Sequence, residues 1–192
     1  MRFPIGILLL GALPSFARAP ADTPRWFLGM DVGYGSLDLR SDQNDAVSKH
    51  ALAITFRGQV RVADLLRVGL ELGGWTLDAY DANDPSKGES VSNVLVVADV
   101  VPTGRYRPLF RIGFGRVEYN NNAPSALEGS GWGWKAAVGY EFPVWRNVRV
   151  VPRLQYGASE LDDAYGVNDR RTGRRYDAWD LGVGVTWVFR GG

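Results

Sequence analysis

His50 is the single histidine of the chain, and any search for catalytic chemistry begins with it. Ser41, Ser48, Asp42 and Asp45 lie close to it in the sequence. A serine hydrolase needs a histidine beside a serine, and an acid that orients the histidine. A lone histidine beside a polar segment is more often an ordinary surface residue, so we expect that the protein is not an enzyme.

Four arginines form a second group, in the segment Arg170-Arg171-Thr172-Gly173-Arg174-Arg175. Guanidinium groups bind phosphate and sulfate groups through paired hydrogen bonds. The cluster could therefore bind the phosphates of lipopolysaccharide, or an extracellular polyanion such as heparan on a host surface. It could equally be balanced within one solvated loop by four nearby acids, Asp162, Asp163, Asp169 and Asp177.

No metal site and no cofactor are predicted. The chain has no cysteine, which excludes disulfide and thiol chemistry. Its acidic clusters match no calcium-loop spacing; they are Asp78, Asp81, Asp84, Asp162 and Asp163. The formal net charge of +1 gives no electrostatic case for nucleic acid as a partner.

A period of two in polarity is the strongest pattern in the chain, and it indicates β-strands that must position these groups. It is clearest in residues 179–189. One face is apolar and carries Trp179, Leu181, Val183, Val185, Trp187 and Phe189. The other carries Asp180, Gly182, Gly184 and Thr186, and only Val188 departs from this small or polar set. A strand of a membrane barrel has such faces, because its outer face meets lipid.

The same alternation recurs in eight segments of a chain long enough for one domain. The predicted strands are residues 25–39, 49–62, 67–77, 91–101, 107–119, 131–142, 147–159 and 179–189. Three predicted connections are short (63–66, 102–106 and 143–146), and four are longer and polar (40–48, 78–90, 120–130 and 160–175). Short turns that alternate with long loops are typical of outer-membrane proteins. We predict an all-β fold, an eight-stranded antiparallel up-and-down transmembrane β-barrel.

Charged residues fall on the face opposite the apolar one, together with many glycines: Asp31, Arg57, Arg61, Glu71, Asp99, Arg111, Lys135, Arg153 and Asp180. The interior of an eight-stranded barrel is just wide enough for side chains, so buried charges must pair there. We expect glycines to make room for an interior ion-pair network. Its predicted members are Glu71, Arg111, Lys135, Arg57, Asp99 and Arg153. Such a network could be a polar plug without conduction, or the gate of a narrow pore.

Aromatic residues gather near the ends of the predicted strands, as in the two aromatic belts of a membrane protein. The belt at the short turns would contain Trp26, Trp145, Trp187 and Phe189. The belt at the long loops would contain Trp75, Trp132, Trp134, Tyr119 and Trp179. A bulge at Gly73-Gly74 would bring Trp75 onto the apolar face. A soluble lipocalin-type barrel fits less well, because much of its outer surface would then be glycine.

Residues 1–21 are predicted to be a signal peptide, and residues 22–192 are predicted to form the barrel domain. Arg2 supplies a positive charge, residues 5–13 are apolar, and Ala19 and Ala21 are small residues before the cleavage point. Cleavage would remove Arg2 and Arg18 and no acid, so that the formal net charge of +1 becomes −1. The apolar run is too short to span a bilayer as a helix.

Over the predicted mature domain the chain resembles the small eight-stranded outer-membrane barrels of the OmpA/OmpX type. The resemblance rests on residues 131–142, GWGWKAAVGYEF, and on residues 184–189, GVTWVF. Residues 184–189 resemble the C-terminal signal that the barrel-assembly machinery recognises in that family. The resemblance implies this role for Gly184, Trp187 and Phe189.

The resemblance implies a place in the Gram-negative outer membrane and contact with its lipids, including lipopolysaccharide. It also implies a non-enzymatic role in envelope structure, surface interaction or adhesion through four extracellular loops. A narrow pore gated by interior charges is the alternative. Some similar barrels modify lipid A, but the histidine-plus-serine motif of the deacylases is absent from the late strands of this sequence.

Overall fold

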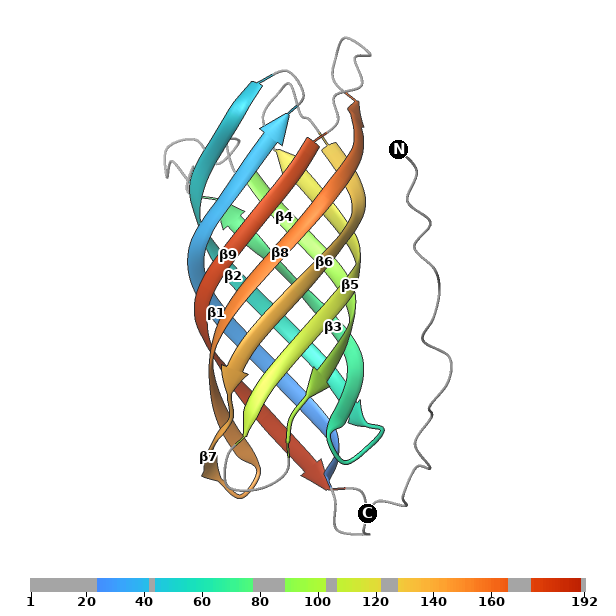
Figure 1. Ribbon diagram of the computed structural model, residues 1–192, viewed down its shortest axis with the longest axis vertical. Coiled ribbons are helices and arrows are strands. Elements are labelled where there is room, and N and C mark those ends of the chain that lie inside the picture. Colours follow the sequence, from blue (N-terminus) through green and yellow to red (C-terminus); the bar gives the residue numbers. More distant parts are fainter. Residues whose placement is uncertain are drawn as a thin grey trace, which may run out of the picture.

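The computed structural model describes residues 24–41, 44–77, 89–102, 107–121, 128–165 and 174–190. These residues form one antiparallel sheet that curves into a tall barrel (Figure 1). Its strands are β1 (Pro24–Ser41), β2 (Asn44–Arg61), β3 (Leu66–Leu77), β4 (Glu89–Val100), β5 (Pro108–Asn121), β6 (Glu128–Tyr140), β7 (Phe142–Trp145), β8 (Val148–Tyr165) and β9 (Arg174–Arg190). The predicted signal peptide, residues 1–21, lies outside the described residues.

Each strand pairs with its neighbours in sequence, and β1 pairs with β9 to close the barrel. The short strand β7 continues β6 after a break at Glu141, and both pair with β8. They therefore count as one strand of the wall, and the predicted eight-stranded up-and-down barrel is confirmed. In the part of the chain that the structure describes, no helix is long and apolar enough to cross a membrane.

Side chains alternate between the outside of the wall and the bore, as the period of two predicts. Trp179 is 51% exposed, whereas its neighbour Asp180 is completely buried. The outward faces carry a broad band of Leu, Ile, Val, Phe and Trp side chains. Burying these residues against lipid rather than water stabilises the fold, so the wall is built for a membrane.

The bore is filled by three groups of side chains. An apolar layer lies toward the end of the barrel that carries the longer connections, which we call the outer end: Leu37, Ala51, Ala53, Trp75, Val91, Val117, Tyr119, Leu161, Tyr176 and Ala178. An ionic layer lies in the middle: Asp31, Arg57, Glu71, Asp99, Arg111, Lys135, Arg153, Gln155 and Asp180. A basic mouth lies at the short-turn end: Phe27, Arg61, Arg67, Arg107, Glu141 and Arg149.

The predicted bulge at Gly73-Gly74 is wrong. Strand β3 keeps its register with β2 and with β4 through both glycines. A Cβ atom at either glycine would press on a neighbouring backbone carbonyl, so both positions favour a close approach of strands without a shift. Trp75 consequently points into the bore, where it is 2% exposed and its ring lies 5.8 Å from that of Tyr176.

The outer aromatic belt is therefore smaller than predicted. Trp132, Trp134 and Trp179 do face outward, but Trp75 and Tyr119 belong to the apolar layer. Large aromatic side chains fill the bore as well as they fill a lipid interface, so residue type alone does not separate the two places. At the short-turn end, Trp26, Trp145, Trp187 and Phe189 are all exposed on the wall, as predicted.

Two predicted long loops are partly strand. Strands β1 and β2 reach Ser41 and Asn44, so most of the predicted loop 40–48 is paired backbone. Strand β8 runs to Tyr165 and β9 begins at Arg174, so half of the predicted loop 160–175 belongs to strands. The apolar alternation ends where the wall meets water, but backbone pairing continues, so polarity alone placed these strand ends too early. The predicted turn 143–146 also differs from the structure, since β7 occupies most of these residues.

Candidate functional site

Glycines on the inner face make room for the ionic layer. A Cβ atom at Gly184 would overlap the Asp31 carboxylate, and one at Gly33 would overlap the Asp180 carboxylate. At Gly29 a Cβ atom would collide with the guanidinium of Arg57. The glycine-rich inner face of β1 and β9 therefore leaves the space that charged side chains from neighbouring strands occupy.

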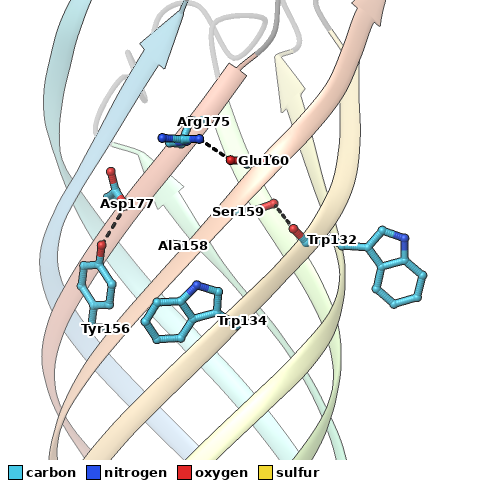
Figure 2. Close-up of a pocket in the computed structure, with 8 residues that line it drawn as sticks. All are labelled: Trp132, Trp134, Tyr156, Ala158, Ser159, Glu160, Arg175 and Asp177. Atoms are coloured by element: carbon cyan, nitrogen blue, oxygen red, sulfur yellow. Dashed lines mark hydrogen bonds and ion pairs between the residues drawn. The ribbon is translucent and has the colours of Figure 1, made fainter. Parts of the chain in front are cut away.

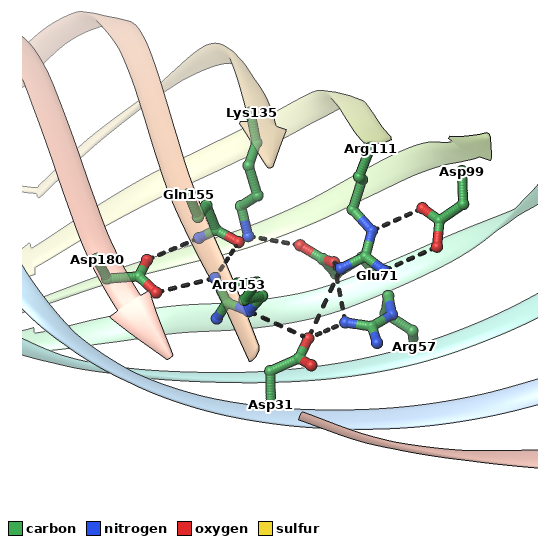
Figure 3. Close-up of polar contacts among 9 residues, drawn as sticks. All are labelled: Asp31, Arg57, Glu71, Asp99, Arg111, Lys135, Arg153, Gln155 and Asp180. Carbon is green, nitrogen blue, oxygen red and sulfur yellow. Dashed lines mark hydrogen bonds and ion pairs between the residues drawn. The ribbon is translucent and has the colours of Figure 1, made fainter. Parts of the chain in front are cut away.

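The ionic layer consists of carboxylates and cations that hydrogen-bond in pairs (Figure 3). Arg111 donates from Nε and Nη2 to the Asp99 carboxylate, at 2.6 and 2.8 Å. Arg153 donates from Nη1 to Oδ1 of Asp180 at 2.8 Å. Two further pairs join Arg57 to Asp31 and Lys135 to Glu71. Charge-assisted bonds of this kind offset the cost of burying each ion.

These pairs are linked into one network. Nη1 of Arg111 lies 3.6 Å from a Glu71 oxygen and 3.7 Å from an Asp31 oxygen. Nε of Arg153 lies 3.7 Å from the same Asp31 oxygen. The layer holds four cations and four carboxylates, so its formal charges balance.

All six residues expected in an ion-pair network lie within this layer. Sequence reasoning placed Asp31 and Asp180 on the inner face but did not assign them to the network, and it missed Gln155 as a member. Gln155 donates to Asp180 at 2.9 Å and accepts from Arg153 at 2.8 Å. The only indication in the sequence for Asp31, Asp180 and Gln155 was that each falls on the inward face of its strand. Which inward side chains meet across the bore depends on the register of the strands, which the sequence pattern does not show.

The ionic layer fills the bore rather than opening it. Glu71 and Asp180 are completely buried, and the other charged members are at most 5% exposed. Among the described residues, no group of three histidine or acidic side chains could hold a metal ion. What the layer can do chemically is hold buried charges of both signs at fixed positions in the middle of the barrel.

His50 lies on the outward face, where its ring stacks on Tyr34 with centroids 5.8 Å apart. The hydroxyl of Ser48 is hydrogen-bonded to Ser36 at 2.9 Å. In the described residues no hydrogen bond joins His50 to a serine or an acid. Asp42 lies outside the described residues, as do the side chains of Ser41 and Asp45. The imidazole ring of His50 therefore lies on the outward surface of the barrel wall in this structure.

A groove on the outer wall lies over β6, β8 and β9, toward the outer end (Figure 2). Its aromatic side consists of Trp132, Trp134 and Tyr156, and the rings of Trp134 and Tyr156 lie 5.4 Å apart. Its polar side consists of Glu160, Arg175 and Asp177, and the small Ala158 leaves space between the two sides. Aromatic rings beside charged groups suit the boundary between acyl chains and headgroups.

The structure describes only some residues of the predicted arginine cluster. Arg170 and Arg171 lie outside the described residues, and Arg174 is described only in its backbone, as the first residue of β9. Arg175 pairs with Glu160 across β8 and β9, and both side chains are exposed. Of the predicted balancing acids, Asp177 accepts a hydrogen bond from Tyr156 at 2.7 Å and lies 3.9 Å from Arg40. Asp169 lies outside the described residues, and Asp162 and Asp163 are described only in their backbone.

The residues of the predicted assembly signal lie on both faces of β9. Trp187 and Phe189 face outward at the short-turn end and line an apolar hollow with Leu28 and Phe56. Gly184 faces the bore beside Asp31. The two aromatics are thus presented to lipid, whereas the glycine serves the packing of the interior.

A closed barrel with a lipid-facing apolar wall and a packed polar bore defines the class of integral outer-membrane β-barrels. The chain belongs to the outer membrane protein beta-barrel domain family, whose model matches residues 5–189. The protein is therefore located in the Gram-negative outer membrane. In such barrels the short turns lie in the periplasm, so the outer end is extracellular.

Comparison with solved structures gives the same fold at low identity. Neisserial surface protein A is 14% identical with a TM-score of 0.63, over 85% of this chain and 97% of that chain. The outer membrane protein AlkL, solved in lipid bilayers, is 14% identical with a TM-score of 0.54, over 95% of this chain and 98% of that chain. No curated protein matches this sequence significantly. These likenesses concern the fold alone, and membership of the family decides neither for nor against catalysis.

Proposed function

We propose that the protein is a non-enzymatic, closed barrel that serves envelope structure and surface contact, including adhesion, from its extracellular side. The observation that carries this proposal is a change of polarity along the outer wall. Above the outer aromatic belt, the outward faces of β1, β2, β8 and β9 become polar: Ser36, Asp38, Arg40, Ser48, His50, Glu160, Arg175 and Asp177.

The lengths of these strands support a wall that projects from the membrane. Strands β1, β2 and β8 have 18 residues each, whereas β3 and β4 have 12. At about 3.3 Å per residue and a tilt of about 40°, the longer strands rise roughly 45 Å. The apolar band of an outer-membrane barrel is about 25 Å tall. The part of these strands that extends beyond the apolar band forms a polar sheet of paired backbone. Such a sheet is a more rigid contact surface than a loop.

Partners follow from the chemistry of this projecting wall. The groove of Figure 2 suits the headgroup region of outer-leaflet lipids, with lipopolysaccharide as the main candidate, because its rings would contact acyl chains while Arg175 would contact headgroup phosphates. Arg40 and Arg175, with the predicted Arg170, Arg171 and Arg174, are the side chains that would contact a sulfated or phosphorylated polyanion. The barrel-assembly machinery remains the proposed reader of Trp187 and Phe189.

Adhesion is tested with the purified barrel in lipid nanodiscs, applied to immobilised heparan sulfate and to host cells. Binding by the unaltered protein, weakened in the double variant Arg40→Gln/Arg175→Gln, would support contact through the projecting wall. Arg116→Gln is the matched control, because Arg116 is also exposed but lies on β5, which β6 separates from β8 and which is not one of the longer strands. Equal binding by all three proteins would remove the wall arginines from the proposal.

The alternative is a narrow pore gated by the ionic layer. Its support is the presence of buried, paired charges in the bore, as in a gate that opens when pairs exchange. Planar-bilayer recordings of the unaltered protein, of Arg111→Gln and of Arg111→Gln/Trp75→Ala, which alters both layers, distinguish the two functions. Steps of conductance in the unaltered protein would favour the pore, and silence in all three proteins would favour the closed barrel.

A further inference from the structure

Three arginines of the basic mouth surround one aromatic ring. The guanidinium carbons of Arg67, Arg61 and Arg149 lie 4.0, 5.7 and 6.0 Å from the centre of the Phe27 ring. Phe27 is 1% exposed and Arg67 is 2% exposed, so this is an inward cluster and not a surface patch. Cation–π contacts favour each guanidinium at the ring, but they supply no negative charge.

Arg107 adds a fourth cation on the same side of the barrel. It directly precedes β5 and stands two and four residues before the inward-facing Leu109 and Arg111, so it continues their inward parity. Its carbonyl oxygen accepts a hydrogen bond from the backbone N–H of Glu141 at 2.9 Å, and its charge repels those of Arg61 and Arg149, which places it in the mouth.

Glu141 serves only two of these four cations. It accepts a bond from Nη2 of Arg67 at 3.0 Å and from Nη1 of Arg149 at 2.6 Å, and it is completely buried. In the described part of the chain, Arg61 and Arg107 have no ion pair, and the Nε atom of each is buried without a hydrogen-bond partner. The exposed Asp64, in the turn after β2, attracts Arg61 electrostatically but forms no ion pair with it.

The mouth therefore differs from the layer above it. Among the described residues, the ionic layer has four cations and four carboxylates, whereas the mouth has four cations and one buried carboxylate. Arg61 and Arg67 even stand directly opposite each other on β2 and β3, an arrangement that repels. Leu109 stands between Arg107 and Arg111 along the chain, and Val151 stands between Arg149 and Arg153, so that with Val101 they form a small apolar cluster between the two levels on this side of the bore.

Partly buried cations that repel one another are costly unless an anion joins them. Guanidinium forks match the oxygens of a phosphate, and a phosphate that carries about two negative charges offsets an excess of three better than one carboxylate. We propose that the periplasmic mouth is a binding site for a phosphate group, held chiefly by Arg61 and Arg107. Arg67 and Arg149 stay bound to Glu141 and form the positive wall of the site.

The test measures binding of inorganic pyrophosphate to the full barrel in a phosphate-free detergent, by calorimetry, with chloride at equal ionic strength as the reference. We expect saturable binding, weakened at least tenfold in Arg61→Gln/Arg107→Gln. Arg146→Gln, an exposed arginine in the turn after β7, should bind like the unaltered protein. Glu141→Gln should bind more tightly, since the competing carboxylate is gone, and a merely damaged fold would not produce that direction.

The source of the phosphate group is distinguished by repeating the titration in phospholipid nanodiscs. If lipid headgroups reach the mouth, pyrophosphate binding seen in detergent is lost in nanodiscs; if it persists, the ligand is soluble and periplasmic. The proposal is overturned if pyrophosphate binds no better than chloride, or if the double variant binds as tightly as the unaltered protein.

Discussion

Replacement of Glu71 by glutamine is the sharpest test of the ionic layer. Glu71 is completely buried, hydrogen-bonds to Lys135, and lies 3.6 Å from Arg111 and 3.9 Å from Arg57. Glutamine has nearly the same size and shape, so Glu71→Gln removes one negative charge and leaves the packing of the bore unchanged. Four cations then face three carboxylates.

The expected loss of stability follows from the position of the charge. Removal of one partner from a buried ion pair costs about 3–5 kcal/mol, because the remaining charge stays buried without compensation. At about 1.4 kcal/mol per factor of ten, this shifts the unfolding equilibrium by roughly two to three and a half powers of ten. Glu160→Gln is the matched control, since Glu160 also pairs with an arginine, Arg175, but is 75% exposed. An exposed pair contributes less than about 1 kcal/mol.

Equilibrium urea unfolding of the barrel in lipid vesicles, followed by tryptophan fluorescence, measures both free energies of unfolding. The double variant Glu71→Gln/Lys135→Met removes one charge of each sign and restores equal numbers in the layer. It should recover more than half of the loss, because replacing both partners of a buried pair is often neutral. A loss below about 1 kcal/mol in Glu71→Gln, or a double variant worse than either single change, would refute the reasoning.

Three further outcomes are expected. Gly184→Val forces a side chain into the Asp31 carboxylate and should lower the free energy of unfolding by about 1–3 kcal/mol, whereas Gly58→Ala, with open space outside the wall, should change it by less than about 1 kcal/mol; urea titration compares them. In variants with one tryptophan each, brominated lipids should quench Trp134 but spare Trp75, and equal quenching would place Trp75 on the wall. Unboiled samples should migrate faster than boiled ones on SDS gels, because a closed sheet resists the detergent; identical mobility would argue against a closed barrel.

Much of the fold was predictable because its strongest determinant is local. Whether a residue faces lipid or the bore changes at every step along a strand, so neighbours such as Trp179 and Asp180 reveal both faces at once. The six predicted network members were found in the same way, by charge and parity alone. The membrane and the topology followed from the apolar outer faces and the alternating short and long connections, and the family likeness agreed with both.

What escaped prediction depends on relations between strands. Arg67 and Glu141 are separated by 74 residues and meet only because the barrel closes with a particular stagger, which no local pattern records. The mouth was missed for this reason, although Arg61 had been placed on the inner face. The phase of β3 after Gly73-Gly74 was misjudged because Trp75 fits either side chemically, and only its packing on Tyr176 decides.

The order of layers along the bore limits how this barrel could conduct. An ion that displaced pairs in the ionic layer would next meet the apolar layer, where Trp75, Leu37 and Tyr176 are each at most 2% exposed. Burial of a charge among such side chains is far more costly than exchange between paired carboxylates and cations. Exchange of ion pairs alone therefore cannot open a path, and a substitution confined to the ionic layer weakens the barrel before it creates a channel. A pore in this protein would need a second movement that withdraws Trp75 and Tyr176 together, and recordings should accordingly be made with substitutions in both layers.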